Sequence, residues 1–158
     1  MKRITVDLVM SFNPCYDREH VKDLFGGKKW MMPLTVLKLD TVSHEDKIWL
    51  LCRSDFLDDK QLRLFACDCA ERVLPIFEKE CPEDNRPRKA IEVARLFADG
   101  EATHEELDAA RAAAWAAARA AARAASWAAA WAASYAAAWA AEEKWQLGRL
   151  AHYLRGEK

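Results

Sequence analysis

The sequence predicts an all-α protein, an irregular multi-helix bundle with a long C-terminal helix rich in alanine, tryptophan and arginine. Three observations support this fold class. Helix-capping residues recur along the chain, the alternation typical of strands is confined to the short segment at residues 4–9, and residues 111–141 contain 21 alanines in 31 positions. Alanine has the highest helix propensity, so we expect that last segment to be helical.

The length of 158 residues suits one domain with its own core. We therefore expect a single helical domain over residues 1–158. Its predicted parts are short helices in residues 1–56, two amphipathic helices in residues 57–100, and one long alanine-rich helix in residues 103–147.

The net charge of −1 is unevenly distributed along the chain. Residues 1–56 carry +1, residues 57–110 carry −6, and residues 111–158 carry +4. This pattern favours packing between the acidic middle and the basic end of the chain. It indicates an acidic partner such as nucleic acid only second, because the basic residues are few and spread out.

Residues 1–56 contain the starts of four predicted short helices. Ser, Thr and Asp accept hydrogen bonds from the first free amides of a helix, and proline suits the first helical position. The expected starting residues are Thr5, Asp17, Pro33 and Ser43.

Two amphipathic helices are expected next. Apolar residues at three- and four-residue steps predict a helix after Asp58, and Pro75 should kink it because proline removes an amide donor. The following helix should open near Pro87 and end at Gly100, a residue suited to the left-handed conformation of a C-terminal cap.

The long helix should begin near His104, because Thr103 and Glu106 have the spacing of a capping box. Nothing breaks its pattern before Gly148. If continuous, it would span about 65 Å at ~1.5 Å per residue, longer than a domain of this size is wide. A bend, a break or a protruding end is therefore expected, with Ser126 and Ser134 as candidate positions.

Large residues recur at every fourth position of the alanine-rich tract. Four residues overshoot one helical turn by about 40°, so these side chains wind around the helix. This period is too long for a two-stranded coiled coil. Residues 124–141 are uncharged, but their tryptophans lie through the middle and they contain no Leu, Ile, Val or Phe, which argues against a membrane span.

A packed central helix fits the tract better, with its tryptophans in the core. The alternative is a partner-binding face at the beginning of the tract, since Trp and Arg are the residue types most enriched at binding hot spots. The residues of this candidate face are Arg111, Trp115, Arg119 and Arg123.

The chain contains five cysteines without a repeated spacing and no recognisable signal peptide. We expect reduced thiols in a cytoplasmic protein. Cys67 and Cys69 lie two residues apart on a predicted helix and so point to nearly opposite sides, which disfavours a shared metal ion. We interpret both as small core residues.

Enzyme signals are weak. The sequence has no glycine-rich phosphate loop, no zinc-protease motif and no nucleophile-elbow motif. The histidines are far apart among charged residues, where we expect exposure, and His44 with Glu45 and Asp46 is interpreted as a solvated first helical turn. We predict no catalytic residue, no metal site and no cofactor.

The segments "LRLFACDCAERVLPIFEKE" and "RKAIEVARLFADGEATHEELDAARAAAWAAARAAARAA" resemble an alanine-rich family of immunity proteins of bacterial polymorphic toxin systems, also found among phage and planctomycete hypothetical proteins. The resemblance covers roughly residues 57–141. It implies a small all-helical protein that binds and neutralises a toxin, and it supplies no catalytic residue.

The leading functional hypothesis is a non-enzymatic inhibitor that occludes a partner protein. One alternative is a phage counter-defence protein, for example an anti-CRISPR. Another is a nucleic-acid or nucleotide binder acting through the candidate face. No membrane association is expected, and the sequence leaves the oligomeric state open.

Overall fold

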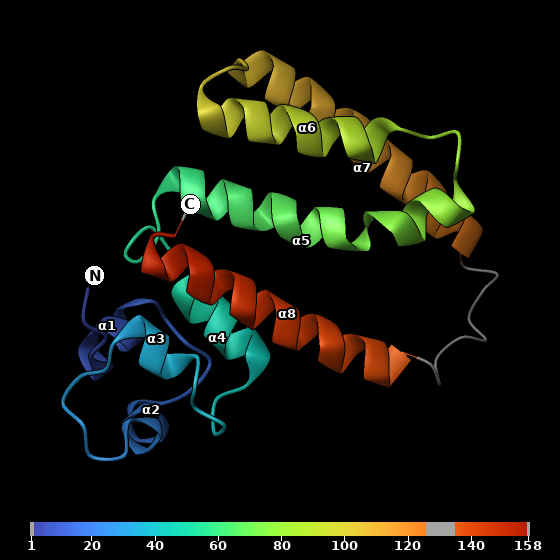
Figure 1. Ribbon diagram of the computed structural model, residues 1–158. Helices are drawn as coiled ribbons and strands as arrows, with labels where there is room; N and C mark the ends of the chain where they lie inside the picture. Colours follow the sequence, from blue (N-terminus) through green and yellow to red (C-terminus); the bar gives the residue numbers. More distant parts are fainter. Residues whose placement is uncertain (1, 126–134, 158) are drawn as a thin grey trace. The chain divides into compact units, whose positions relative to one another are not determined.

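The structure is a computed structural model that describes the backbone of residues 2–125 and 135–157 and the side chains of residues 2–116 and 141–157. Within these ranges the chain forms eight helices, which confirms the all-α prediction (Figure 1). Ile4 and Met31 pair in an isolated antiparallel bridge. The helices are α1 (Val6–Ser11), α2 (Arg18–Phe25), α3 (Pro33–Val36), α4 (His44–Leu51), α5 (Asp59–Glu80), α6 (Arg86–Asp99), α7 (His104–Ala125) and α8 (Tyr135–Arg155).

The four short helices begin at the predicted residues. Thr5 Oγ1 accepts a hydrogen bond from the Leu8 amide at 3.1 Å, and Asp17 Oδ1 accepts one from the His20 amide at 2.8 Å. Pro33 is the first residue of α3. Ser43, the N-cap of α4, accepts from the amide three residues on at 3.0 Å. These local hydrogen bonds explain why short helices form there.

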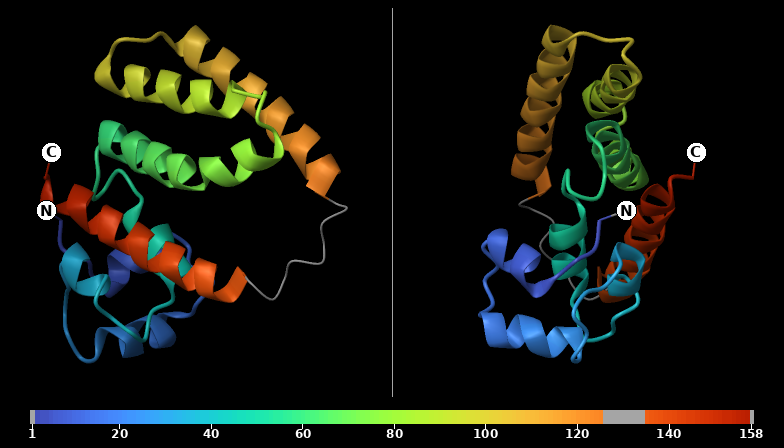
Figure 2. Two further views of the ribbon diagram at one scale, coloured as in Figure 1. Left: turned by 45° about the vertical axis from the view of Figure 1, so that its right-hand side comes forward. Right: turned by 90° about the vertical axis from the view of Figure 1, so that its left-hand side faces the viewer.

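Helices α5 and α6 follow the predicted pattern. Pro75 lies inside α5, and Figure 2 shows the axis of this helix bending along its length. Helix α6 begins at Arg86, next to Pro87, and ends before Gly100. Gly100 has a φ of 80°, a left-handed conformation that costs glycine little.

The alanine-rich tract begins its helix where the capping box predicts, at His104. Helix α7 extends to Ala125, and α8 starts at Tyr135. The predictions that concern the continuity of the long helix, the bend at Ser126 or Ser134 and the packing of Trp127 and Trp131 lie outside the described residues.

The expected end of the long helix at Gly148 is wrong. Helix α8 continues through Gly148 to Arg155, and the left-handed glycine that follows it is Gly156, with a φ of 71°. A glycine inside a helix costs only about 1 kcal/mol. Burial of the apolar side chains that come after it, Leu150, Tyr153 and Leu154, outweighs that cost.

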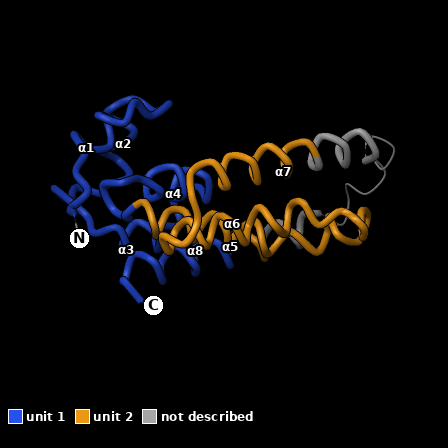
Figure 3. Tube along the Cα trace, turned by 90° about the horizontal axis from the view of Figure 1, so that it is seen from above, with its two compact units in different colours: residues 1–58, 143–158 blue, residues 59–142 orange. Residues whose placement is uncertain are grey.

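The chain divides into two compact units, shown in different colours in Figure 3. Unit 1 comprises residues 1–58 and 143–158, and its core includes Ile4, Leu51 and Leu150, each with no exposed surface. Unit 2 comprises residues 59–142 and contains α5, α6 and α7. The single domain over residues 1–158 stays a prediction.

No helix among the described residues has both the length and the apolar character needed to cross a bilayer. The uncharged tract at residues 124–141 includes residues 126–134, which lie outside the described ranges.

Candidate functional site

Helices α5 and α6 form an antiparallel pair that ion pairs join near both ends. At one end, Lys60 Nζ lies 2.7 Å from Asp99 Oδ1. At the other, the Arg88 guanidinium donates two hydrogen bonds to the Glu78 carboxylate, at 2.7 and 2.8 Å. The four side chains are 30–55% exposed, so these ion pairs contribute little to stability.

Arg95 makes the central connection of this helix pair. Its Nη2 atom donates to Asp68 Oδ1 at 2.7 Å and to Glu71 Oε2 at 2.6 Å. Asp68 is buried, with 7% of its side chain exposed. Burial alone would lower the pKa of Arg95, but the hydrogen bonds to both carboxylates outweigh it and raise that pKa. Arg95 therefore neutralises a carboxylate that could not remain buried unpaired.

The turn between α6 and α7 sets the direction in which the alanine-rich helix starts. The Thr103 amide donates to Glu106 Oε2 at 2.8 Å, and the Glu106 amide donates to Thr103 Oγ1 at 3.2 Å, the reciprocal bonds of a capping box. The Phe97 ring packs edge-on against His104 at 4.6 Å between ring centroids. Leu107, one turn into α7, is buried with 2% exposure. Local and core contacts together thus anchor the start of α7.

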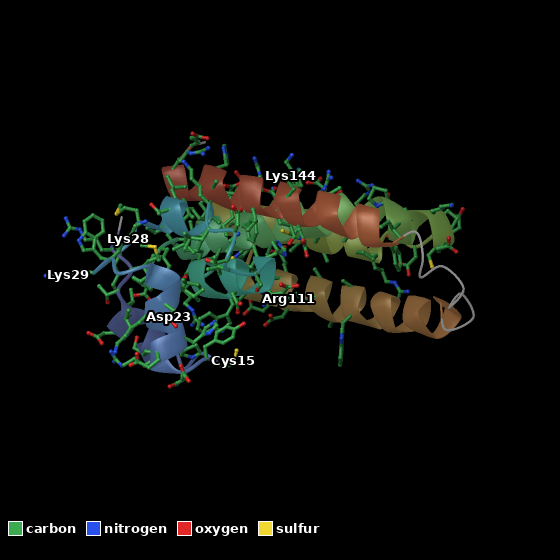
Figure 4. The ribbon with its side chains drawn as sticks, turned by 90° about the horizontal axis from the view of Figure 1, so that it is seen from below. Cys15, Asp23, Lys28, Lys29, Arg111 and Lys144 are labelled. Carbon is green, nitrogen blue, oxygen red and sulfur yellow. The ribbon has the colours of Figure 1, made fainter. Side chains whose placement is uncertain are left out.

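Two residues of the candidate face, Arg111 and Trp115, lie on the anchored part of α7, and both are exposed. Trp115 is 67% exposed, the largest value among the large apolar side chains of the described residues. Arg111, labelled on α7 in Figure 4, has 63% of its side chain exposed. Its Nη1 atom lies 3.9 Å from Asp108 Oδ1. The two side chains are four residues apart and so lie on one side of the helix.

Arg119 and Arg123 continue the same spacing, and their backbone belongs to α7. Their side chains lie outside the described residues. The binding role of all four candidate residues remains a prediction.

The exposure of Trp115 corrects the core prediction for this tryptophan. The side chains of the other tryptophans of the tract lie outside the described residues. The three residues on either side of Trp115 in the sequence are alanines, and their small side chains offer too little surface to cover an indole. Trp145, beyond the tract on α8, is partly buried.

A second correction concerns His44, which the sequence predicts to be exposed. Only 14% of its side chain is exposed, and its Nδ1 atom lies 3.9 Å from Glu143 Oε1. Within the described residues its Nε2 atom is buried without a hydrogen-bond partner. His44, Glu45 and Glu143 each offer one atom able to bind a metal ion, and these three atoms lie within 4.8 Å of one another. Sequence reasoning missed this cluster because Glu143 comes from a distant helix.

The cysteines differ in exposure, and this predicts different reactivity. Cys15 is exposed, Cys67 is buried and Cys69 is partly buried. Burial raises the pKa of Cys67, and it raises the pKa of Cys69 to about 11 from 9.0. The thiolate is the reactive form, and at pH 8 a shift of that size lowers its fraction about 100-fold.

We therefore expect Cys15 to react with a disulfide reagent well before Cys67 and Cys69, measured by mass spectrometry of labelled peptides at pH 8. In denaturant the thiols should react at similar rates. Equal rates in the folded protein would contradict the burial of Cys67 and Cys69.

The same pKa shifts predict a pH dependence of stability. Because folding raises these pKa values, the unfolded chain loses thiol protons first. The free energy of unfolding should therefore fall as the pH rises from 9.0 towards about 11.

Comparisons with known proteins place the sequence in a family context. A family model described as "Imm-5 like putative immunity protein" matches residues 56–153. The match includes helices α5, α6 and α7 and most of α8. Searches of curated proteins and of solved structures gave no match.

Proposed function

Because the chain belongs to the Imm-5 like putative immunity protein family, we propose that it binds a protein toxin and neutralises it by steric occlusion. Occlusion needs only affinity and a well-placed surface, and no chemical step by the inhibitor. The requirement is a rigid element that presents side chains able to bury a large area on contact.

Trp115 is the observation that carries this proposal. An indole can bury about 150–250 Å² on contact, and Trp and Arg dominate binding hot spots. Here Trp115 is largely exposed one turn beyond Arg111, on a helix whose start is fixed by a capping box and by buried Leu107. Such an anchor loses little conformational freedom when a partner covers it.

Charge around the start of α7 favours a basic partner. Glu101, Glu105 and Asp108 are exposed there, and residues 57–110 carry a net charge of −6. Acidic surfaces accelerate association with basic proteins and repel phosphate backbones. This supports a toxin with a basic surface, and it argues against the nucleic-acid alternative, because Arg111 lies beside the Asp108 carboxylate.

Co-expression with a toxin tests the proposal. We expect the chain to restore growth of cells that produce the toxin encoded beside its gene, and to be retained on that toxin in a pull-down. Trp115→Ala should weaken binding by about 30-fold or more, the effect of a hot-spot residue. Trp30→Ala is the matched control, because Trp30 is an exposed tryptophan of unit 1, 42% exposed.

Failure to protect cells and failure to retain the toxin would together refute the proposal. If Trp30→Ala and Trp115→Ala weaken binding equally, the role of α7 is refuted, but toxin binding itself is not. A chain that instead binds a host defence complex, and whose gene neighbours encode phage structural proteins, would favour the counter-defence alternative.

A further inference from the structure

A cavity of about 410 Å³ lies within unit 1. Its walls come from α1 to α4 and the segments that connect them, and they are mainly apolar. Several of the wall residues are themselves nearly fully buried: Ile4, Val21, Phe25, Met31 and Val36. This volume falls in the range of ligand pockets, about 300–1,000 Å³, and is large enough for a tryptophan-sized group.

Polar side chains line one part of this cavity. Tyr16 Oη donates a hydrogen bond to Asp46 Oδ2 at 3.0 Å, and Ser43 Oγ donates to the same oxygen at 2.7 Å. The hydrogen bond to Asp46, and then its charge, raise the pKa of Tyr16, so the phenol stays protonated and can keep donating. Exposed Cys15 and exposed Glu45 also line the cavity.

The charge along the cavity wall is negative. Of the described residues that line the cavity, the two that carry a charge, Glu45 and Asp46, are both acidic. The basic pair Lys28 and Lys29 lies well apart from Cys15 in unit 1 (Figure 4). An apolar interior beside two carboxylates fits a group that combines a large apolar part with an adjacent positive charge.

We propose that this cavity takes up one large aromatic or aliphatic side chain of the partner protein, next to a lysine or arginine that pairs with Glu45. This inference rests on the proposed function, because the occupant is a segment of the toxin. It adds a second anchor to Trp115, and it commits the partner to a segment with the sequence pattern apolar–basic.

Blocked dipeptides test the cavity without the toxin. In NMR titrations of the full chain, N-acetyl-Trp-Arg-amide should shift the amide signals of Val21, Leu24 and Met31 and slow the alkylation of Cys15. N-acetyl-Trp-Glu-amide should bind up to about fivefold more weakly than N-acetyl-Trp-Arg-amide, because it loses one exposed ion pair. N-acetyl-Ala-Arg-amide should not bind measurably, because it lacks the large apolar group. Signals that move elsewhere, or equal binding of the three peptides, would overturn the proposal.

Two variants and one control sharpen the test. Leu24→Trp should fill the cavity and abolish binding of N-acetyl-Trp-Arg-amide. Glu45→Lys should reverse the preference, so that the Trp-Glu peptide binds better than the Trp-Arg peptide. Asp23→Lys changes the charge equally at an exposed position of α2 outside the cavity lining, and should leave the preference unchanged. If Leu24→Trp does not fold, Glu45→Lys against Asp23→Lys still decides.

The co-expression assay separates this inference from the proposed function. If Trp115→Ala abolishes protection while Glu45→Lys and Leu24→Trp protect fully, the chain is an immunity protein and the cavity proposal is wrong. If the Trp-Arg peptide binds as expected but the chain neutralises no toxin, the proposed function fails, and with it the assignment of the occupant to a toxin.

Discussion

Replacing Arg95 by methionine should lower the free energy of unfolding by about 3 kcal/mol, measured by urea denaturation. The change removes the cation that pairs with Asp68, whose side chain is only 7% exposed. A buried carboxylate that loses its paired cation is costly to keep ionised. The expected loss lies at the lower end of the range for buried pairs because 33% of the Arg95 side chain is exposed.

Arg88→Met is the matched control for this prediction. It removes the same residue type from the same helix, and it also breaks a pair of hydrogen bonds to a carboxylate of α5. Because the Arg88 and Glu78 side chains are 50% and 30% exposed, the loss should be about 1 kcal/mol or less. Equal losses for the two variants would show that burial of Asp68 does not govern the effect.

A double variant provides a further check. Arg95→Met combined with Asp68→Leu replaces the buried charges by apolar groups, which in other buried pairs is close to neutral. We expect the double variant to recover most of the stability that Arg95→Met loses. A double variant as unstable as the single one would indicate that Arg95 acts mainly by packing.

Leu150→Ala should lower the free energy of unfolding by about 3–5 kcal/mol. Leu150 has no exposed surface in the core of unit 1, so truncation removes buried methyl groups and leaves a void. Gly148→Ala, two residues earlier in α8, should instead stabilise the protein by up to about 1 kcal/mol. A Cβ added at Gly148 would meet no atom of the described residues within 4 Å.

These opposite signs test the path of α8. Thermal or urea unfolding of the two variants provides the measurement. If the helix ended at Gly148, as the sequence suggests, alanine there would destabilise by removing a left-handed cap. Stabilisation by Gly148→Ala would therefore confirm that the helix passes through this residue.

The local features of this fold could be predicted from sequence because their causes are local. Thr5, Asp17, Ser43 and Thr103 each cap a helix by bonding to an amide three residues away, so a short stretch of sequence contains the complete interaction. The same holds for Gly100, which needs only a left-handed backbone.

Features that depend on distant partners could not be predicted in this way. His44 looked like a solvated first-turn residue, and its burial depends on α8, including Glu143. A glycine such as Gly148 is typical of a helix end, yet the burial of Leu150 stabilises the helix beyond it. Within the candidate site, Arg111 and Trp115 could be proposed from residue type alone, but the 67% exposure of Trp115 required the structure. The cavity, made from four separate helices, left no sequence motif.

The division into two units has a consequence for biosynthesis. Unit 2 is a continuous stretch, residues 59–142, and the neighbouring helices α5, α6 and α7 pack as sequential hairpins. Such short-range contacts form quickly and can do so while the chain is still being translated. Unit 1 is discontinuous, since residues 1–58 share their core with residues 143–158. Part of the apolar surface of its first helices therefore stays uncovered until Leu150 has left the ribosome. This unit is thus completed last.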